Sequence, residues 1–344
     1  MRLTLCVTDF HLEQAALGAG AAERLPALPG LESLLRQGRG LAPQPDWRAA
    51  LLVEAGVPAA SAQALALAPA HVAARLLDVA PGNGLWFAQP VHRVAGISRV
   101  SLHAAGLLRL SPEEALGWSE EFNRAFDGSG LRLHPLAPTL LMEGLPSDAQ
   151  GQGDPARWLG AALSASIAPG AADRAMRAVG AEIEMWLHEH PRNQARERRG
   201  ELAVNGLWLW GGGRGENGEL DVLTINKQTG TQSALPPAYG DDVFLRGLWK
   251  ARGGAVERAD RFADLPAGTV EAIVCCSAAA SGPRDDPMQR LENDWFAPLR
   301  DALARRELAS LRLWIGGRGW RIAPSWLPRL PWRRPVRWWR EAAT

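Results

Sequence analysis

Alternating and clustered apolar positions predict several strands separated by helices. Residues 2–8 alternate between apolar and polar side chains, which predicts a first strand. Short apolar runs at 85–88, 269–276 and 311–317 predict further buried strands, and 269–276 is rich in β-branched residues. In the second half of the chain these strands alternate with helices, a pattern typical of a largely parallel sheet with helices on both faces.

Capping residues mark where several helices begin. Asp46 precedes a helix over 47–54, and the segment Ser111-Pro112-Glu113-Glu114 combines a capping hydroxyl, a first-position proline and first-turn acids. That second helix is expected to extend to Phe126. Further helices are expected at 28–38, 175–188, 242–249 and 286–306.

The order of strands and helix over 85–145 is typical of a small α+β domain, and a segment rich in turn-forming residues follows at 144–155. The predicted fold class is therefore α/β, a mostly parallel sheet flanked by helices with a small inserted α+β domain. We expect residues 1–84 to form the first part of the α/β core, 85–145 the inserted domain, 156–322 the remainder of the core and 323–344 a tail rich in Trp, Arg and Pro.

One stretch, Trp186 to Gly213, combines these patterns with polar chemistry. Its apolar run 204–210 predicts a buried strand, and the three glycines that follow indicate a backbone that turns tightly or lies close to another group. The His and Arg side chains at 188–199 could surround an anion or remain solvated. We expect any ligand site of this chain to lie here.

Composition narrows the function classes. The formal charge of +1 gives no support for nucleic acid or an anionic membrane as a partner. Three cysteines are too few for a disulfide framework, and no apolar run reaches the roughly 18 residues that span a bilayer. The N-terminus lacks signal-peptide features, so we expect a cytoplasmic protein. The tail interleaves Trp with Arg at 326–340, and docking against the body is favoured over a membrane or nucleic-acid surface.

The familiar catalytic motifs do not occur in the sequence. It has no phosphate-binding loop and no GxSxG elbow, and Gly211-Gly212-Gly213-Arg214-Gly215 opens no convincing helix. His188 and His190 form an i, i+2 pair at a helix end, which is a poor metal chelate by itself, so structural or solvated histidines are favoured over metal ligands. Asp285 and Asp286 could bind a cation but fit better as a helix cap.

The stretch around the three glycines resembles a family signature. The segment His190 to Arg196, then Gly200, then Val204 to Gly213 resembles the HPxNxxR, G and xNxLWLWGxG signature of bacterial RpfE-type regulatory proteins. Supporting matches lie at 31–39, 86–92 and 111–115, so the resemblance covers most of the chain. The chain is more distantly similar to archaeal-type, cofactor-independent phosphoglycerate mutases of the alkaline phosphatase superfamily. That similarity implies an alkaline-phosphatase-like fold.

The mutase resemblance also implies a two-metal centre, built from an Asp-rich N-terminal motif, a Ser/Thr nucleophile, an Asp-x-x-Gly-His motif and a late Asp-His pair. Two metals clamp the attacking and leaving oxygens in phosphoryl transfer. In this chain Asp9 is at most a remnant of the first motif, 277–282 reads SAAASG where Asp-x-x-Gly-His is expected, and 314–318 reads WIGGR where Asp-His is expected. We therefore expect no metal, no cofactor and no catalytic residue of the family mechanism.

These observations favour a non-catalytic regulatory protein with a degenerate phosphomutase-like fold that binds a small anionic ligand or a protein partner. The alternative is an active phosphoglycerate mutase or another metal-dependent phosphotransferase with unrecognised ligands. Arg offers a fork for phosphate or carboxylate and glycine amides can complete such a site, whereas Asn193, Asn205 and Arg196 could equally tie down turns and carbonyls. The expected ligand-binding residues are Asn193, Arg196, Asn205, Trp210, Gly211, Gly212, Gly213 and Arg246.

Overall fold

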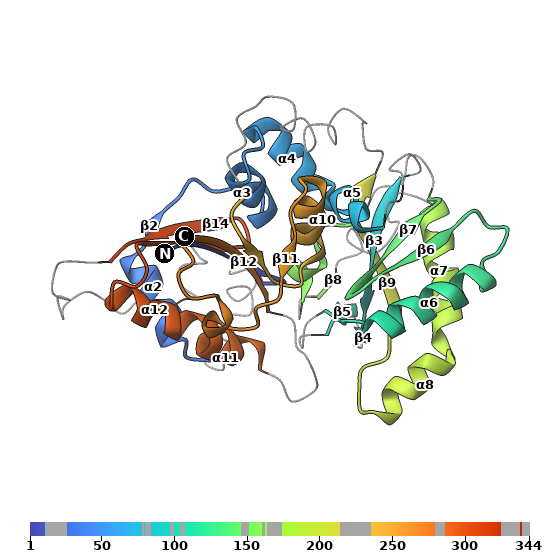
Figure 1. Ribbon diagram of the computed structural model, residues 1–344. Coiled ribbons are helices and arrows are strands. Elements are labelled where there is room, and N and C mark those ends of the chain that lie inside the picture. The colour runs from blue at the N-terminus through green and yellow to red at the C-terminus, as the bar shows by residue number, and fades with distance from the viewer. Residues whose placement is uncertain are drawn as a thin grey trace.

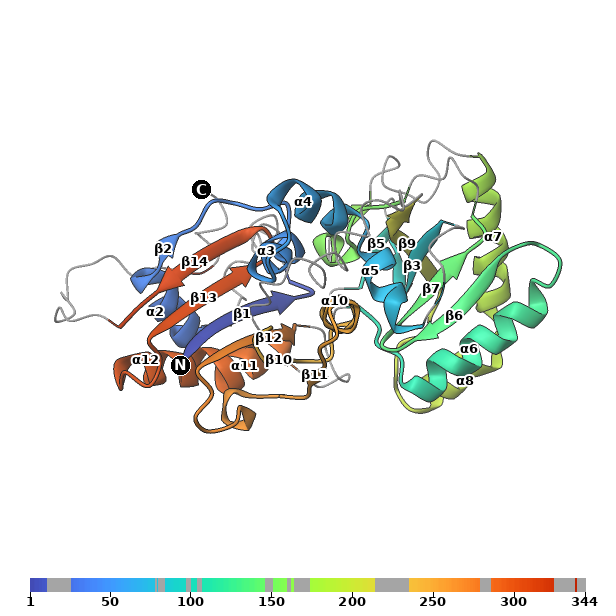
Figure 2. The same cartoon turned by 45° about the horizontal axis from the view of Figure 1, so that its top comes forward.

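Two groups of strands, each with its own helices, lie side by side in the computed structural model (Figures 1 and 2). The main group is built from segments near both ends of the chain and the second group from its middle. The structure describes residues 1–10, 26–77, 79, 84–96, 100–103, 107–145, 151–159, 162–163, 174–213, 235–278, 286–324 and 338.

The main sheet has seven strands in the order β11-β10-β12-β1-β13-β14-β2. Its central strand β1 pairs in parallel with both β12 and β13, and β10 and β11 continue the parallel arrangement, whereas β14 and β2 are antiparallel. The predicted α/β class, a mostly parallel sheet flanked by helices, is confirmed. The strands are β1 (Arg2–Thr8), β2 (Arg39–Gly40), β10 (Ala238–Tyr239), β11 (Val256–Glu257), β12 (Glu271–Ser277), β13 (Ser310–Ile315) and β14 (Arg318–Ile322).

Side chains of β1 alternate between two cores, because successive residues of a strand point to opposite faces. Leu3, Leu5 and Val7 pack with α2, α11 and α12 on one face, whereas Cys6 packs with α3, α4 and α10 on the other. This alternation is what the pattern at 2–8 predicts. The helices are α2 (Pro29–Gln37), α3 (Trp47–Glu54), α4 (Ala59–Leu67), α10 (Val243–Ala251), α11 (Pro287–Leu291) and α12 (Ala297–Ala304).

The predicted helix starts are confirmed. Asp46 accepts hydrogen bonds from the first amides of α3, and Asp242 does the same for α10. Ser111 and Glu114 form a capping box at the start of α6 (Pro112–Ala125). The long helix expected at 286–306 is one helical stretch, in which a π-helical turn at Glu292–Phe296 joins α11 to α12.

The second group contains a four-stranded antiparallel sheet in the order β6-β7-β3-β9. The helices α6, α7 and α8 lie along one side of it in Figures 1 and 2, and a small sheet β4-β5-β8 adjoins it. The strands of the second group are β3 (Leu85–Val91), β4 (Arg93–Ala95), β5 (Val100–Leu102), β6 (Arg132–Leu136), β7 (Thr139–Glu143), β8 (Ala162–Leu163) and β9 (Gly206–Gly213). The other helices of the chain are α5 (Pro69–Ala73), α7 (Arg174–His188), α8 (Pro191–Arg198) and the 3-10 turns Ala74–Leu76, Pro155–Trp158 and Phe262–Asp264.

Strand β9 lies in this second sheet, whereas residues 156–322 are expected from the sequence to belong to the main α/β core. It runs antiparallel to β3, with Phe87 opposite Trp210 and Val91 opposite Gly206. A strand that is apolar at successive positions can be buried in either sheet, so its own pattern does not choose the partner. The second group therefore extends to Gly213, well beyond the boundary expected at 145.

Parts of the chain with sequence predictions fall outside the described residues. These include Arg214, Gly215, Asp285 and most of the tail, of which 325–337 and 339–344 are not described. Trp338 is described, is buried, and donates its indole N–H to the Pro26 carbonyl at 3.1 Å. Among the helices that the structure describes, none is long and apolar enough to cross a membrane.

Candidate functional site

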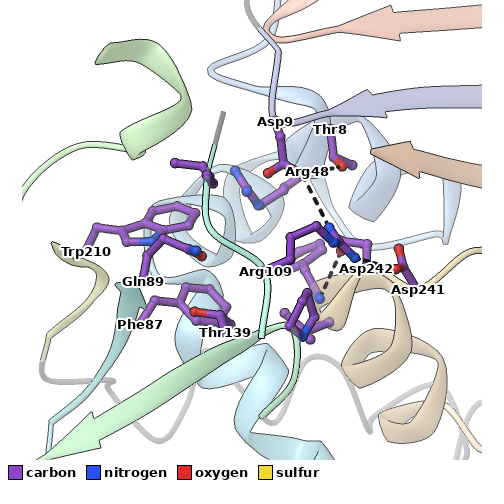
Figure 3. A pocket seen from close by; sticks show the side chains of 14 residues that line it. Thr8, Asp9, Arg48, Phe87, Gln89, Arg109, Thr139, Trp210, Asp241 and Asp242 are labelled. Atoms are coloured by element: carbon purple, nitrogen blue, oxygen red, sulfur yellow. Dashed lines mark hydrogen bonds and ion pairs between the residues drawn. The ribbon is translucent and has the colours of Figure 1, made fainter. Parts of the chain in front are cut away.

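A hollow lies where the two groups of strands meet, beside the carboxyl end of β1 and the turn after β10 (Figure 3). Ligands of α/β sheets characteristically bind in the crevice outside the carboxyl ends of parallel strands. We refer to this hollow as the strand-end pocket. The main group lines it with Thr8, Asp9, Arg48, Asp241 and Asp242, and the second group with Phe87, Gln89, Arg109, Thr139 and Trp210.

Arg48 is the most deeply engaged charged residue of the strand-end pocket. It stands in the first turn of α3, is 5% exposed, and pairs with Asp46 at 2.8 Å and Asp154 at 3.0 Å. Its guanidinium also lies over the rings of Trp47 and Trp210, 4.7 and 4.9 Å from their centroids. Burial lowers the pKa of Arg48, but the two carboxylates outweigh burial and hold that pKa above its ordinary value. Arg48 is therefore a fixed positive charge.

Arg109 reaches the same pocket from the second group. Its Nη1 lies 3.2 Å from the Ser277 hydroxyl and 3.8 Å from the Asp9 carboxylate, and its Nη2 bonds to Asp241. Figure 3 shows its side chain extended between Asp9 and the pair Asp241 and Asp242. The residue therefore connects the second group of strands to the carboxyl edge of the main sheet.

Asp242 caps α10 and is also a partly buried titratable carboxyl group at the edge of the strand-end pocket. One oxygen accepts hydrogen bonds from the amides of Phe244 and Leu245, at 2.9 and 3.0 Å, which caps α10. Burial raises the pKa of Asp242 to about 6, although Arg48 and the Leu245 amide act to lower it. This carboxyl therefore changes charge just below neutral pH.

Three buried polar atoms of the pocket lining have no hydrogen-bond partner in the part of the chain that the structure describes. They are Nε of Arg48, Oγ1 of Thr139 and the indole Nε1 of Trp210, on side chains that are 5%, 5% and 8% exposed. Nearby Gln89 is held by the Leu108 carbonyl, to which its amide donates at 2.8 Å. Buried polar groups are normally paired, and these three unpaired atoms belong to residues that line one hollow.

Negative charge exceeds positive charge around the strand-end pocket. Arg48 is paired with two carboxylates, Arg109 contacts Asp9 and Asp241, and Asp242 interacts with Arg48. An excess of carboxylates opposes a strongly anionic ligand. The pocket thus offers hydrogen-bond donors without a net positive field.

Three of the sequence-predicted ligand residues lie elsewhere and make structural contacts. Asn193 is buried and bonds to the carbonyls of Leu187 and Val204 and to the Val204 amide, each at 2.8 Å. Arg196 pairs with Glu114 at 2.7 Å and donates to the Leu202 carbonyl. Asn205 clamps the backbone of Arg93 through both ends of its amide.

The remaining predicted residues are divided between the pocket and other places. Trp210 lines the strand-end pocket, whereas Arg246 is an exposed residue of α10 and does not line it. Gly211, Gly212 and Gly213 belong to β9. A Cβ on Gly212 would lie 2.0 Å from the Leu85 carbonyl oxygen, so this glycine permits close pairing with β3.

The two-metal centre implied by the mutase resemblance does not fit the residues present. Asp9 ends β1 as expected, but its carboxylate accepts hydrogen bonds from Thr8 and Ser277 and faces the Arg109 guanidinium. The turn between β13 and β14 consists of Gly316 and Gly317. Within the described ranges, no group of three or more His, Cys, Asp or Glu is placed to hold a metal. The described residues therefore do not supply the ligand set that two-metal phosphoryl transfer requires.

A second hollow adjoins the first and shares Arg109 and Asp241 with it. Cys275 and Cys276 line it from β12, and both thiols are free and buried. Burial raises the pKa of Cys275 and of Cys276, so both thiols stay protonated and unreactive at neutral pH.

Sequence reasoning found few of the residues that form the strand-end pocket. Asp9 was noted as the remnant of a metal motif, and Trp210 as part of the family-like signature. Arg48 and Arg109 were not singled out, because their contacts with Asp154 and Asp241 join segments far apart in the chain.

The fold and the pocket define an α/β protein with a carboxyl-edge site. No family model and no curated protein matches the sequence. Among solved structures, the PH0037 protein from Pyrococcus horikoshii is 13% identical with a TM-score of 0.43, over 94% of this chain and 87% of that chain. A cofactor-independent phosphoglycerate mutase from Thermoplasma acidophilum is 14% identical with a TM-score of 0.37, over 95% and 90% of the two chains. These values are too low to bear on activity.

Proposed function

We propose that the protein is a non-catalytic regulatory protein with a degenerate phosphomutase-like fold, which binds a small ligand in the strand-end pocket. The observation that carries ligand binding is the set of unpaired atoms on Arg48, Thr139 and Trp210. A buried polar group without a hydrogen bond costs about 1–3 kcal/mol. A ligand that accepts from the two N–H groups and bonds to the hydroxyl would recover part of that free energy.

The non-catalytic part of the proposal is supported by the occupants of the carboxyl edge. The carboxylates Asp9 and Asp241, which follow β1 and β10 at this edge, face the Arg109 guanidinium. Two-metal catalysis needs such carboxylates free for metal ions. The regulatory role rests on the resemblance of the segment 190–213 to RpfE-type proteins.

The chemistry of the pocket favours an uncharged ligand with carbonyl or hydroxyl oxygens over the anion expected from the sequence. The donors on Arg48 and Trp210 call for oxygen acceptors, whereas the carboxylate excess repels phosphate and carboxylate groups. The rings of Phe87 and Trp210 supply an apolar wall. A small polyol, sugar or amide meets all of these conditions.

Ligand-observed NMR with two matched tryptophan variants tests the proposal. The probes are small uncharged polyols, sugars and amides on one side, and inorganic phosphate and 3-phosphoglycerate on the other. Trp210→Phe keeps an aromatic ring and removes the pocket N–H. Trp118→Phe removes another buried, unpaired indole N–H, in the core of the second group, and serves as control.

We expect saturation transfer to an uncharged probe in the wild type and in Trp118→Phe, and a loss of at least fivefold in Trp210→Phe, since one hydrogen bond is worth about 1 kcal/mol. No transfer to any uncharged probe, or transfer that Trp210→Phe leaves intact, contradicts the proposed site. The active-mutase alternative predicts bound divalent metal and turnover of phosphoglycerate. Metal analysis and a mutase and phosphatase assay on the purified protein decide that question.

A further inference from the structure

We propose that Arg109 is a built-in cation, whose guanidinium fills a latent divalent-cation site formed by Asp9, Asp241 and Ser277. The inference deepens the proposed function, because it explains why the carboxyl edge carries acidic residues without a metal-binding set. It concerns the charge that these residues hold, and is independent of which ligand enters the strand-end pocket.

The oxygen atoms around Arg109 come from adjoining strands of one sheet edge. Asp9 follows β1, Ser277 ends β12 and Asp241 follows β10, and the three strands are neighbours in the order β10-β12-β1. Ser277 donates to Asp9 at 2.6 Å, and Arg109 contacts Ser277 at 3.2 Å and Asp9 at 3.8 Å while bonding to Asp241. One positive group thus lies among the oxygens of three strand ends.

Such an oxygen set suits a hard divalent cation once the guanidinium is removed. Mg²⁺ and Mn²⁺ prefer carboxylate, hydroxyl and water oxygens, and Mg²⁺ commonly needs only one or two protein carboxylates. A guanidinium is a positive group tethered to the chain, so it cannot leave the site as a metal ion can. Repulsion between two cations at contact distance then keeps a metal ion out of the wild-type protein.

Because Arg109 comes from another part of the fold, a guanidinium in place of a metal ion has a structural consequence. The residue belongs to the second group of strands, whereas Asp9, Asp241 and Ser277 belong to the main group. A free metal ion would neutralise the carboxylates but would not join the two groups of strands. The tethered guanidinium of Arg109 neutralises the carboxylates and also joins the groups. The arrangement of the strand-end pocket therefore does not depend on metal supply.

Replacement of Arg109 by Ser, with Mn²⁺ as the probe, tests the inference by calorimetry and by the Mn²⁺ EPR signal. We expect Arg109→Ser to bind one Mn²⁺ at least tenfold more tightly than the wild type, and Asp9→Asn in the Arg109→Ser background to abolish the gain. Arg109→Lys keeps a positive charge and is expected to bind as weakly as the wild type. Arg258→Ser is the control, because Arg258 lines the adjoining hollow but pairs with exposed Asp260.

Circular dichroism checks that each variant is folded, and Arg109→Gln replaces the Ser variant if that one does not fold. Absence of a Mn²⁺ gain in a folded Ser or Gln variant overturns the inference, as does an equal gain in Arg258→Ser. The proposed function fails differently, through turnover or an occupied metal site in the wild type. If the wild type holds no metal and the Arg109 variants gain no Mn²⁺ binding, the built-in cation inference fails and the proposed function stands.

Discussion

The buried triad of Arg48, Asp46 and Asp154 permits a quantitative prediction for Arg48→Met. The three side chains are 6%, 12% and 11% exposed, so water screens their charges poorly. Met has a similar length and keeps the contacts with Trp47 and Trp210, whose rings flank the guanidinium. The substitution therefore removes the charge with little change in packing, and leaves two carboxylates without their cation.

Removal of one partner from a buried ion pair costs about 3–5 kcal/mol, because the remaining charge is left uncompensated. We expect a loss of that size in the free energy of unfolding of Arg48→Met. Asp154→Asn in the same background removes one of the two stranded charges and should restore about half of the loss. Asp46 is left unchanged, since it also caps α3.

Urea unfolding at pH 7, followed by circular dichroism, measures these differences. The control is Arg2→Met, because Arg2 pairs with Glu271 at 3.0 Å on the surface, where the side chains are 61% and 49% exposed. An exposed pair of this kind contributes about 0–1 kcal/mol. If Arg48→Met is no more destabilising than Arg2→Met, or if Asp154→Asn deepens the loss, the triad does not hold the pocket as described.

Two further predictions concern the backbone beside the pocket and its titratable carboxyl. Gly212→Ala should destabilise the protein by more than about 2 kcal/mol in thermal or urea unfolding, because the new Cβ would meet the Leu85 oxygen at 2.0 Å, whereas Gly40→Ala, which has open space around it, should stay within about 0.5 kcal/mol. Burial raises the pKa of Asp242 from 3.8 to about 6, so the folded state holds the proton more tightly and stability falls as pH rises between these values. Asp242→Asn retains the cap and cannot ionise, so its free energy of unfolding should exceed that of the wild type by about 1–3 kcal/mol at pH 7 and equal it at pH 3. Melting curves at the two pH values measure this difference, and an equal effect at both would contradict the prediction.

Several parts of the fold could be predicted because their causes are local. The alternation at 2–8 decides which side chains of β1 face each layer of helices, and Asp46 and Ser111 cap helices through amides two or three residues away. Each of these interactions joins residues within one turn or one strand. A short segment of sequence therefore contains all the information needed to predict them.

The assignment of β9 shows where local information ended. Its apolar residues and glycines indicated a buried strand, and a strand was found at 206–213. The sequence pattern could not indicate that β3, more than a hundred residues earlier, would be its partner. Sheet pairing depends on which surfaces meet when the whole chain packs, and that is a property of the tertiary structure.

The difference between local and tertiary information also applies to the candidate site. By itself the sequence determined an α/β protein with well-marked strands and caps, and it identified Trp210 within a distinctive segment. Only the tertiary structure decided that Arg196 pairs with Glu114, that Arg48 pairs with Asp154, and that Arg109 meets the carboxylates at the strand ends. The physical reason is that the role of a charged side chain depends on the groups that surround it after burial, and these come from distant parts of the chain.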